Sequence, residues 1–181
     1  IHFNNSELEA LSEHGIGVAH CPNANMRLGS GICPVPKMLE QGIKVGIGVD
    51  GSASNDSGHI LGELRQALYL ARVDGGAEAM SAMDALELGT WRAAELIGRD
   101  DIGRIATEFC GDCALFPVHD LYSNGCENAV DALLICHPRQ ACELVIGGNI
   151  RIKNGLLSSV DLEELMHSHH DRAKQIHNNL H

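Results

Sequence analysis

The sequence predicts an α/β protein in which parallel strands are covered by helices, followed by a small β-rich region and a terminal helix. Two observations predict this order. Helical and strand patterns alternate along the amino-terminal half, and repeated strand–helix units with short connections imply parallel strands. Beyond Arg99, short apolar runs are separated by Gly, Asn, Pro and Asp, and helical spacing returns from Asp161.

A first helix and a first strand open the chain. We expect a helix capped by Asn5 or Ser6 that runs to about His14. The apolar stretch 16–20 follows as a buried strand. The next stretch, 21–31, is rich in Asn, Gly and Ser and is therefore expected to be a loop.

A second helix and a second strand come next. Pro34 stands where proline is tolerated at a helix start, and Gly42 stands where such a helix should stop. The expected strand over 43–49 places its Val and Ile side chains on one face and two glycines on the other, and Asp50 continues the glycine face.

The remaining elements follow from spacing alone. Apolar residues recur at helical spacing over 57–72 and over 81–97, where one helix or a pair is expected. A terminal helix is expected over 161–178. The short apolar runs between them are expected to be strands, and they cover 113–116, 133–136, 144–146 and 150–152.

Composition excludes several classes of function. The net charge is −11 and aromatic residues are few, so the basic, aromatic stripe that binds nucleic acid is absent. No apolar run approaches the roughly 18 residues of a membrane span, so no membrane partner is expected. Seven cysteines without framework spacing favour free thiols and a cytoplasmic location. Cys110 and Cys113 form one C-x-x-C, which is a weak zinc signal without a second pair.

The most distinctive segment is Gly46-Ile47-Gly48-Val49-Asp50, which ends the second expected strand. In a closed parallel barrel the active site forms at this end of the strands. A buried carboxylate there needs a cation or several hydrogen-bond donors. Asp50 is therefore either part of a site or a residue that caps the following turn.

His20 ends the first expected strand, at the same edge as Asp50. A histidine in this position either contacts a substrate or is a hydrogen-bonded structural residue. The spacing leaves both interpretations open.

Three clusters of residues carry a resemblance to a known family. They are His20-Cys21-Pro22-x-x-Asn25-x-x-Leu28-Gly29-x-Gly31, Gly46-x-Gly48-x-Asp50-Gly51-x-x-Ser54-Asn55, and Asp112-x-Ala114-Leu115-Phe116. Together they resemble the deaminase and chlorohydrolase branch of the amidohydrolase superfamily, over nearly the whole chain. Within that branch, the segments 50–56 and 132–136 are most similar to the 8-oxoguanine deaminases.

The resemblance implies a metal-dependent (β/α)8 barrel. The chain would supply its last two strands and helices (residues 1–98), part of a small composite β domain (99–157) and a carboxyl-terminal helix (158–181). It also implies one divalent metal, zinc in most members and iron in some. Histidines on other strands hold this metal together with the Asp that matches Asp50.

The resemblance further implies the reaction, which is the hydrolytic removal of an amino group from a purine-type ring, most similarly 8-oxoguanine to urate and ammonia. Asp50 would both bind the metal and accept the proton of the attacking water. His20, Asn25 and Ser52 would contact the substrate, a small aminopurine or related heterocycle. The homologous enzymes are commonly homo-oligomers.

Part of the implied site is missing from the sequence. The chain opens at Ile1 and shows no H-x-H on an early strand, so it is expected to begin after the sixth barrel strand. One carboxylate does not make a catalytic zinc site, so the chain alone is expected to bind zinc poorly and to be inactive. The histidine cluster within 167–170 is expected to be a solvated helix face.

Two other functions remain open. The nearest is a guanine, S-adenosylhomocysteine or triazine aminohydrolase or chlorohydrolase, because most groups that distinguish these substrates belong to the missing strands. The other is a non-catalytic α/β binding module in which Asp50 only caps a turn.

Overall fold

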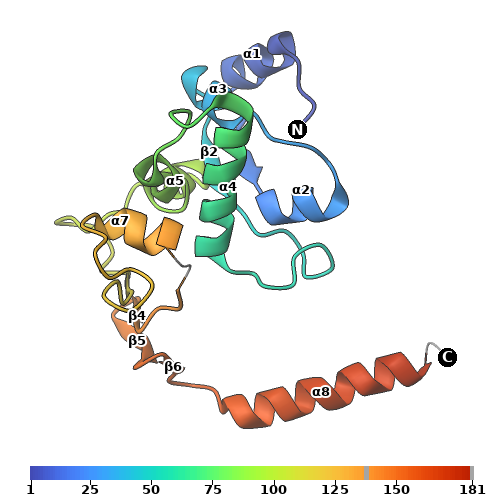
Figure 1. Ribbon diagram of the computed structural model, residues 1–181, viewed down its shortest axis with the longest axis vertical. Helices are drawn as coiled ribbons and strands as arrows, with labels where there is room; N and C mark the ends of the chain where they lie inside the picture. Colours follow the sequence, from blue (N-terminus) through green and yellow to red (C-terminus); the bar gives the residue numbers. More distant parts are fainter. Residues whose placement is uncertain (137–138, 180–181) are drawn as a thin grey trace. The chain divides into compact units, whose positions relative to one another are not determined.

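The structure is a computed structural model that describes residues 1–136 and 139–179 (Figure 1). Its contacts divide the chain into two compact units. Unit 1 comprises Ile1–Cys110 and Val118–Arg139, and unit 2 comprises Gly111–Pro117 and Gln140–His181. No helix within the described residues is both long and apolar enough to cross a membrane.

Unit 1 is mainly helical, with two short strands. Its elements are α1 (Asn5–Glu13), β1 (Val18–His20), α2 (Pro22–Leu28), α3 (Val35–Glu40), β2 (Val45–Ile47), α4 (Ile60–Gly75), α5 (Ala82–Leu88), α6 (Trp91–Leu96), α7 (Ala129–Asp131) and a π-helical turn, η1 (Ala132–Cys136). The helical region expected over 81–97, as one helix or a pair, is therefore confirmed as the pair α5 and α6.

The two strands of unit 1 pair in parallel, as the sequence predicts. Val18 lies opposite Val45 and His20 lies opposite Ile47. Because the strands run in the same direction, the chain leaves both of them at the same edge of the sheet. The mixed α/β class and the parallel pairing are confirmed, and this edge is where the site must be sought.

Helices contact both strands. α6 packs closely on the glycine face of β2, since a Cβ atom added at Gly46 would lie 2.9 Å from the Cα atom of Ala93. α3, α4 and α5 also contact β2, and α4 runs beside it in Figure 1. A helix therefore covers the glycine face of β2 at Gly46.

The core of unit 1 forms around α4. Leu64 and Leu68 on this helix have 1% and 0% of their surface exposed, and Val45 on β2 has 1%. The apolar residues of α4 recur every three or four positions, which places them on one buried face. Burial of this face, rather than helix propensity alone, stabilises the helix.

Two local expectations are wrong in unit 1. The stretch 21–31 is not simply a loop, because it contains α2. Pro22 occupies the first helical turn and Gly29 ends the helix with φ of 66°, so proline and glycine fill the helix-start and helix-stop positions they favour. The cap of α1 is Asn4, whose side chain accepts a hydrogen bond from the Glu7 backbone N–H.

Unit 2 holds an antiparallel sheet and one helix. Its strands are β3 (Cys113–Leu115), β4 (Glu143–Ile146), β5 (Asn149–Lys153) and β6 (Leu156–Leu157), and they pair in sequence order. Three of the four expected β runs are therefore strands. The fourth, 133–136, is wrong, since it belongs to η1 in unit 1.

The terminal helix of unit 2, α8 (Leu162–Asn179), has no buried residue. Its histidines at 167, 169 and 170 are exposed, which confirms the expected solvated face. Residues 180 and 181 of the expected terminal segment lie outside the described residues. The domain boundaries at residues 98 and 157 stay predictions.

Candidate functional site

Asp50 lies three residues beyond the end of β2, at the edge where both parallel strands end. Its φ is 66°, in the left-handed region that Asp tolerates better than most residues. This conformation breaks the strand alternation, so the side chain does not simply continue the glycine face. The residue is exposed.

Local donors hold the Asp50 carboxylate. Its Oδ1 accepts a hydrogen bond from the Gly51 backbone N–H at 2.7 Å, and its Oδ2 accepts one from the Ser54 hydroxyl at 2.8 Å. These two hydrogen bonds, the Gly51 one first, lower the pKa of the Asp50 carboxyl because they favour the charged form. The carboxylate is therefore ionised at neutral pH and has a fixed orientation.

His20 lies at the end of β1 with only 3% of its surface exposed. Burial lowers its pKa to about 4, so the imidazole is neutral at pH 7. Its Nδ1 atom has no hydrogen-bond partner within the described residues. The interpretation of His20 as a hydrogen-bonded structural residue is not supported at that atom.

Cys21 links the two strand ends. A Cβ atom added at Gly48 would lie 2.9 Å from its sulfur, so the thiol packs against the chain just before Asp50. Burial raises the pKa of this thiol, and the negative charges of Asp50 and Glu63 raise it further. Cys21 is therefore a protonated thiol at neutral pH, and it is a packing residue rather than a nucleophile.

Glu63 is the residue of this region that sequence reasoning missed. It lies on the first turn of α4 with 0% of its surface exposed. Its carboxylate accepts hydrogen bonds from the Asn23 backbone N–H at 3.0 Å, from Asn23 Nδ2 at 2.6 Å and from Asn55 Nδ2 at 2.6 Å. The signal was its place four residues before Ala67, on the buried face of the helix.

The other two candidate substrate residues are less constrained. Asn25 is half-buried on α2, and Ser52 is exposed in the turn after Asp50. A cavity of about 300 Å³ lies between α2 and the loop that follows β2, and neither Asn25 nor Ser52 lines it. Its lining residues are Asn23, Arg27, Ser54, Asn55, Asp56 and Ser57. The cavity is lined by polar side chains of α2 and of the loop of residues 48–59, which carries Asp50 and is called the Asp50 loop below.

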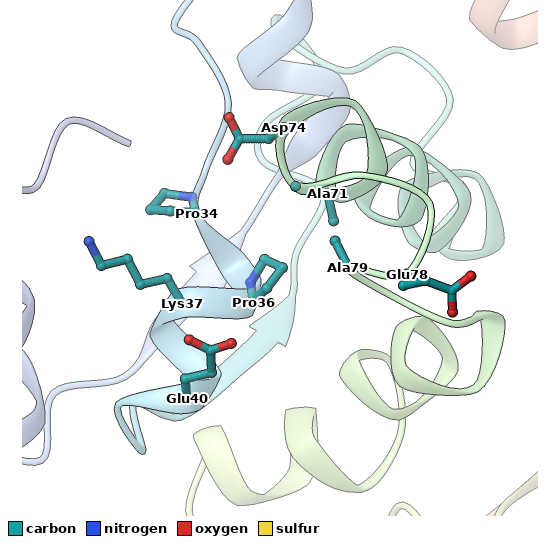
Figure 2. Close-up of a pocket in the computed structure, with 9 residues that line it drawn as sticks. Pro34, Pro36, Lys37, Glu40, Ala71, Asp74, Glu78 and Ala79 are labelled. Carbon is teal, nitrogen blue, oxygen red and sulfur yellow. The ribbon is translucent and has the colours of Figure 1, made fainter.

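A second cavity, of about 480 Å³, lies between α3 and the end of α4. Figure 2 shows Lys37 and Glu40 on its α3 side and Asp74 on its α4 side. None of its lining residues belongs to the segments that directly follow β1 and β2. It is therefore separate from the strand-end edge that carries Asp50.

The part of the chain that the structure describes does not fit a complete metal site. It contains no group of three or more His, Cys, Asp or Glu residues arranged to hold an ion, whereas a catalytic zinc usually has three or more protein ligands. The exposed, ionised Asp50 carboxylate offers one hard oxygen ligand. By itself it cannot hold a metal tightly.

Sequence comparison identifies the class of protein. The model of the amidohydrolase family matches residues 1–151, which is most of the chain. The chain therefore belongs to the amidohydrolase family.

Individual relatives agree with this family. The chain is 42% identical to the 8-oxoguanine deaminase of Pseudomonas aeruginosa over 97% of its own length and 39% of the relative's. It is 34% identical to the 5-methylthioadenosine/S-adenosylhomocysteine deaminase of Dictyoglomus thermophilum, over 97% of the chain and 42% of that protein. The chain thus spans about two fifths of the length of these relatives.

Structural comparison gives the same class. The structure matches a zinc-bound adenosine deaminase from Xanthomonas campestris with a TM-score of 0.90 and 26% sequence identity. The match covers 98% of this chain and 41% of that protein. The described fold is thus similar to part of a known deaminase.

Proposed function

We propose that the full-length protein containing this chain is a metal-dependent aminohydrolase that converts 8-oxoguanine and water to urate and ammonia. The observation that carries the proposal is Asp50, an ionised carboxylate oriented by two donors at the edge where parallel strands end. Its place in an amidohydrolase chain supports the reaction class. The similarity to the Pseudomonas deaminase supports the substrate.

The architecture proposed for the full-length protein is a (β/α)8 barrel. In it, β1 and β2 are the last two strands, residues 99–157 are part of a small composite β domain, and residues 158–181 include the terminal helix. Active sites of such barrels form at the carboxyl ends of the strands, where Asp50 and His20 lie. The short, parallel β1–β2 pair supports this arrangement.

Asp50 supplies one ligand of a divalent metal, zinc in preference to iron, and the other ligands come from the rest of the full-length protein. A bound divalent metal lowers the pKa of water. The residues of this chain then have two tasks. The Asp50 carboxylate accepts a proton and delivers it to the leaving amine, and the Ser54 hydroxyl keeps that carboxylate in place.

His20, Asn25 and Ser52 are proposed to contact the heterocyclic substrate. His20 is neutral at pH 7, because its pKa is about 4, so it can exchange hydrogen bonds with an uncharged ring. A homo-oligomeric state and a cytoplasmic location stay predictions.

The test is ammonia release by the full-length protein from 8-oxoguanine, guanine, S-adenosylhomocysteine and a hydroxy-triazine, with Asp50→Ala as the control. We expect turnover of 8-oxoguanine alone, abolished in the control. Turnover of another amine keeps the reaction class and replaces the substrate. If no compound releases ammonia from zinc-loaded protein, deamination is rejected and a non-catalytic module is favoured.

The 34% identity to an S-adenosylhomocysteine deaminase supports a second candidate substrate. The same panel separates the two, since 8-oxoguanine lacks the ribosyl group of that nucleoside. Preferential release of ammonia from S-adenosylhomocysteine would select the second candidate.

A further inference from the structure

Glu63 is a buried carboxylate that the proposed reaction does not use. It has 0% of its surface exposed, and within the described residues it forms no ion pair. A buried carboxylate of this kind is costly unless several donors satisfy it. Three donors do so here, which indicates that the residue has a purpose other than filling the core.

The three donors come from two segments far apart in the sequence. Asn23 follows β1, at the start of α2, whereas Asn55 follows β2 in the Asp50 loop. The Asn55 amide also donates to the carbonyl of Val49 at 2.8 Å, one residue before Asp50. Glu63 therefore connects the loop that carries Asp50 to the segment that follows His20.

We propose that Glu63 is a positioning residue that fixes the Asp50 loop against the β1 end, so that the carboxylate of Asp50 lies where a metal ligand and proton acceptor must be. This inference rests on the proposed function for its chemical consequence. Its geometric part, the connection of the two strand-end segments, depends only on Glu63 and its donors.

The contact requires two acceptor oxygens. Glu63 Oε2 accepts from the Asn23 backbone N–H, while Oε1 accepts from both Asn23 Nδ2 and Asn55 Nδ2. A glutamine at position 63 has one oxygen and one NH₂ group. In either orientation of the glutamine amide, its NH₂ group faces a donor, so at least one of the three hydrogen bonds is lost while the side-chain volume is nearly unchanged.

The first test is amide hydrogen exchange in the full-length protein, comparing Glu63→Gln with Glu13→Gln. Glu13 is an exposed glutamate on α1 and serves as the matched control. The reporters are the Ser54 and Asn55 amides, which both donate to the Gly51 carbonyl. We expect them to exchange about tenfold faster in Glu63→Gln only, the effect of losing roughly one buried hydrogen bond.

Unchanged exchange of these amides in folded Glu63→Gln would overturn the proposal. If Glu63→Gln does not fold, Asn55→Ala replaces it. This variant removes the hydrogen bond from the loop to Glu63, together with the hydrogen bond from Asn55 to the Val49 carbonyl, and leaves both Asn23 hydrogen bonds to Glu63 intact. The Ser54 amide is then the reporter. We expect it to exchange faster than in the parent, and an unchanged rate would again overturn the proposal.

The second test is the zinc dissociation constant of the folded full-length variants, measured by chelator competition. We expect Glu63→Gln to weaken zinc binding about 10–100-fold, as loss of groups that orient a ligand does, and Glu13→Gln to leave it unchanged. A purely structural role would lower the fraction folded without changing the affinity of the folded protein, so parental affinity would contradict positioning. If the parent protein binds no zinc, the proposed function fails, and the exchange measurement still decides the geometric part.

Discussion

Substituting Gly46 by Ala perturbs the packing that holds β2 in place. The added Cβ atom would lie 2.9 Å from the Cα atom of Ala93 and 3.0 Å from Leu96 Cδ2, whereas ordinary contact begins at 3.4 Å. Either β2 or α6 must therefore shift by about 0.5 Å, the difference between 3.4 and 2.9 Å. Overpacking of this kind lowers the free energy of unfolding by about 1–3 kcal/mol.

The shift also reaches the site, because Asp50 lies four residues beyond Gly46. Misplacement of a catalytic group by about 1 Å costs about 100-fold in rate, so we expect Gly46→Ala to lower the deamination rate about tenfold. Urea denaturation measures the stability, and ammonia release measures the rate. The control is Gly111→Ala, since an added Cβ there meets nothing within 4 Å. Equal stability of Gly46→Ala and Gly111→Ala would refute the close packing of α6 on β2.

Three further predictions concern unit 1. The pKa of buried His20 is about 4, below its ordinary value of 6.5, so between these two pH values the unfolded state binds a proton that the folded state does not. The free energy of unfolding, measured by urea titration, should therefore rise from pH 4 to about 6.5, and this rise should be smaller in His20→Gln. Leu68→Ala empties a fully buried position and should lower the free energy of unfolding by about 2–5 kcal/mol, whereas exposed Val73→Ala on the same helix should change it little. The Arg139 guanidinium holds the pKa of Asp120 well below its usual range, and the stabilisation that this gives is present at neutral pH and is lost as the pH falls below about 4. The free energy of unfolding of Asp120→Asn should therefore depend less on pH in acid than that of the parent, and an equal dependence in both would contradict this prediction.

Much of unit 1 was predictable because its elements follow simple periods. The 3.6-residue spacing of α4 and the apolar character of both strands predict their type and place. The position of Asp50 at a strand end also follows from the sequence. The left-handed backbone of Asp50, with φ of 66°, does not follow, because side-chain alternation assumes a regular strand.

Composition misled in two places. The Asn-rich stretch after Cys21 looks like a loop, yet Pro22 and Gly29 delimit a helix within it. The apolar run 133–136 looks like a strand, but it continues a helix that Asn128 caps by accepting hydrogen bonds from the backbone N–H groups of Val130 and Asp131. Short apolar runs fit a strand or a buried helical turn equally well, so tertiary contacts decide between them.

Glu63 was missed for a different reason. A glutamate among apolar helical positions is usually solvated, and only the fold shows that donors from two distant segments meet it. The sequence identifies the Asp50 end of the site, whereas the network that fixes this end depends on long-range contacts.

The role of Asp50 as a metal ligand is tested by the zinc content per chain of the full-length protein and of Asp50→Asn, measured by elemental analysis after dialysis. The matched control is Asp56→Asn. Asp56 is an exposed carboxylate in the same loop as Asp50, and it pairs with Arg27 on α2. We expect about one zinc per chain in the parent and in Asp56→Asn, and a large loss in Asp50→Asn. Full zinc occupancy in Asp50→Asn would contradict the assignment of Asp50 as a metal ligand.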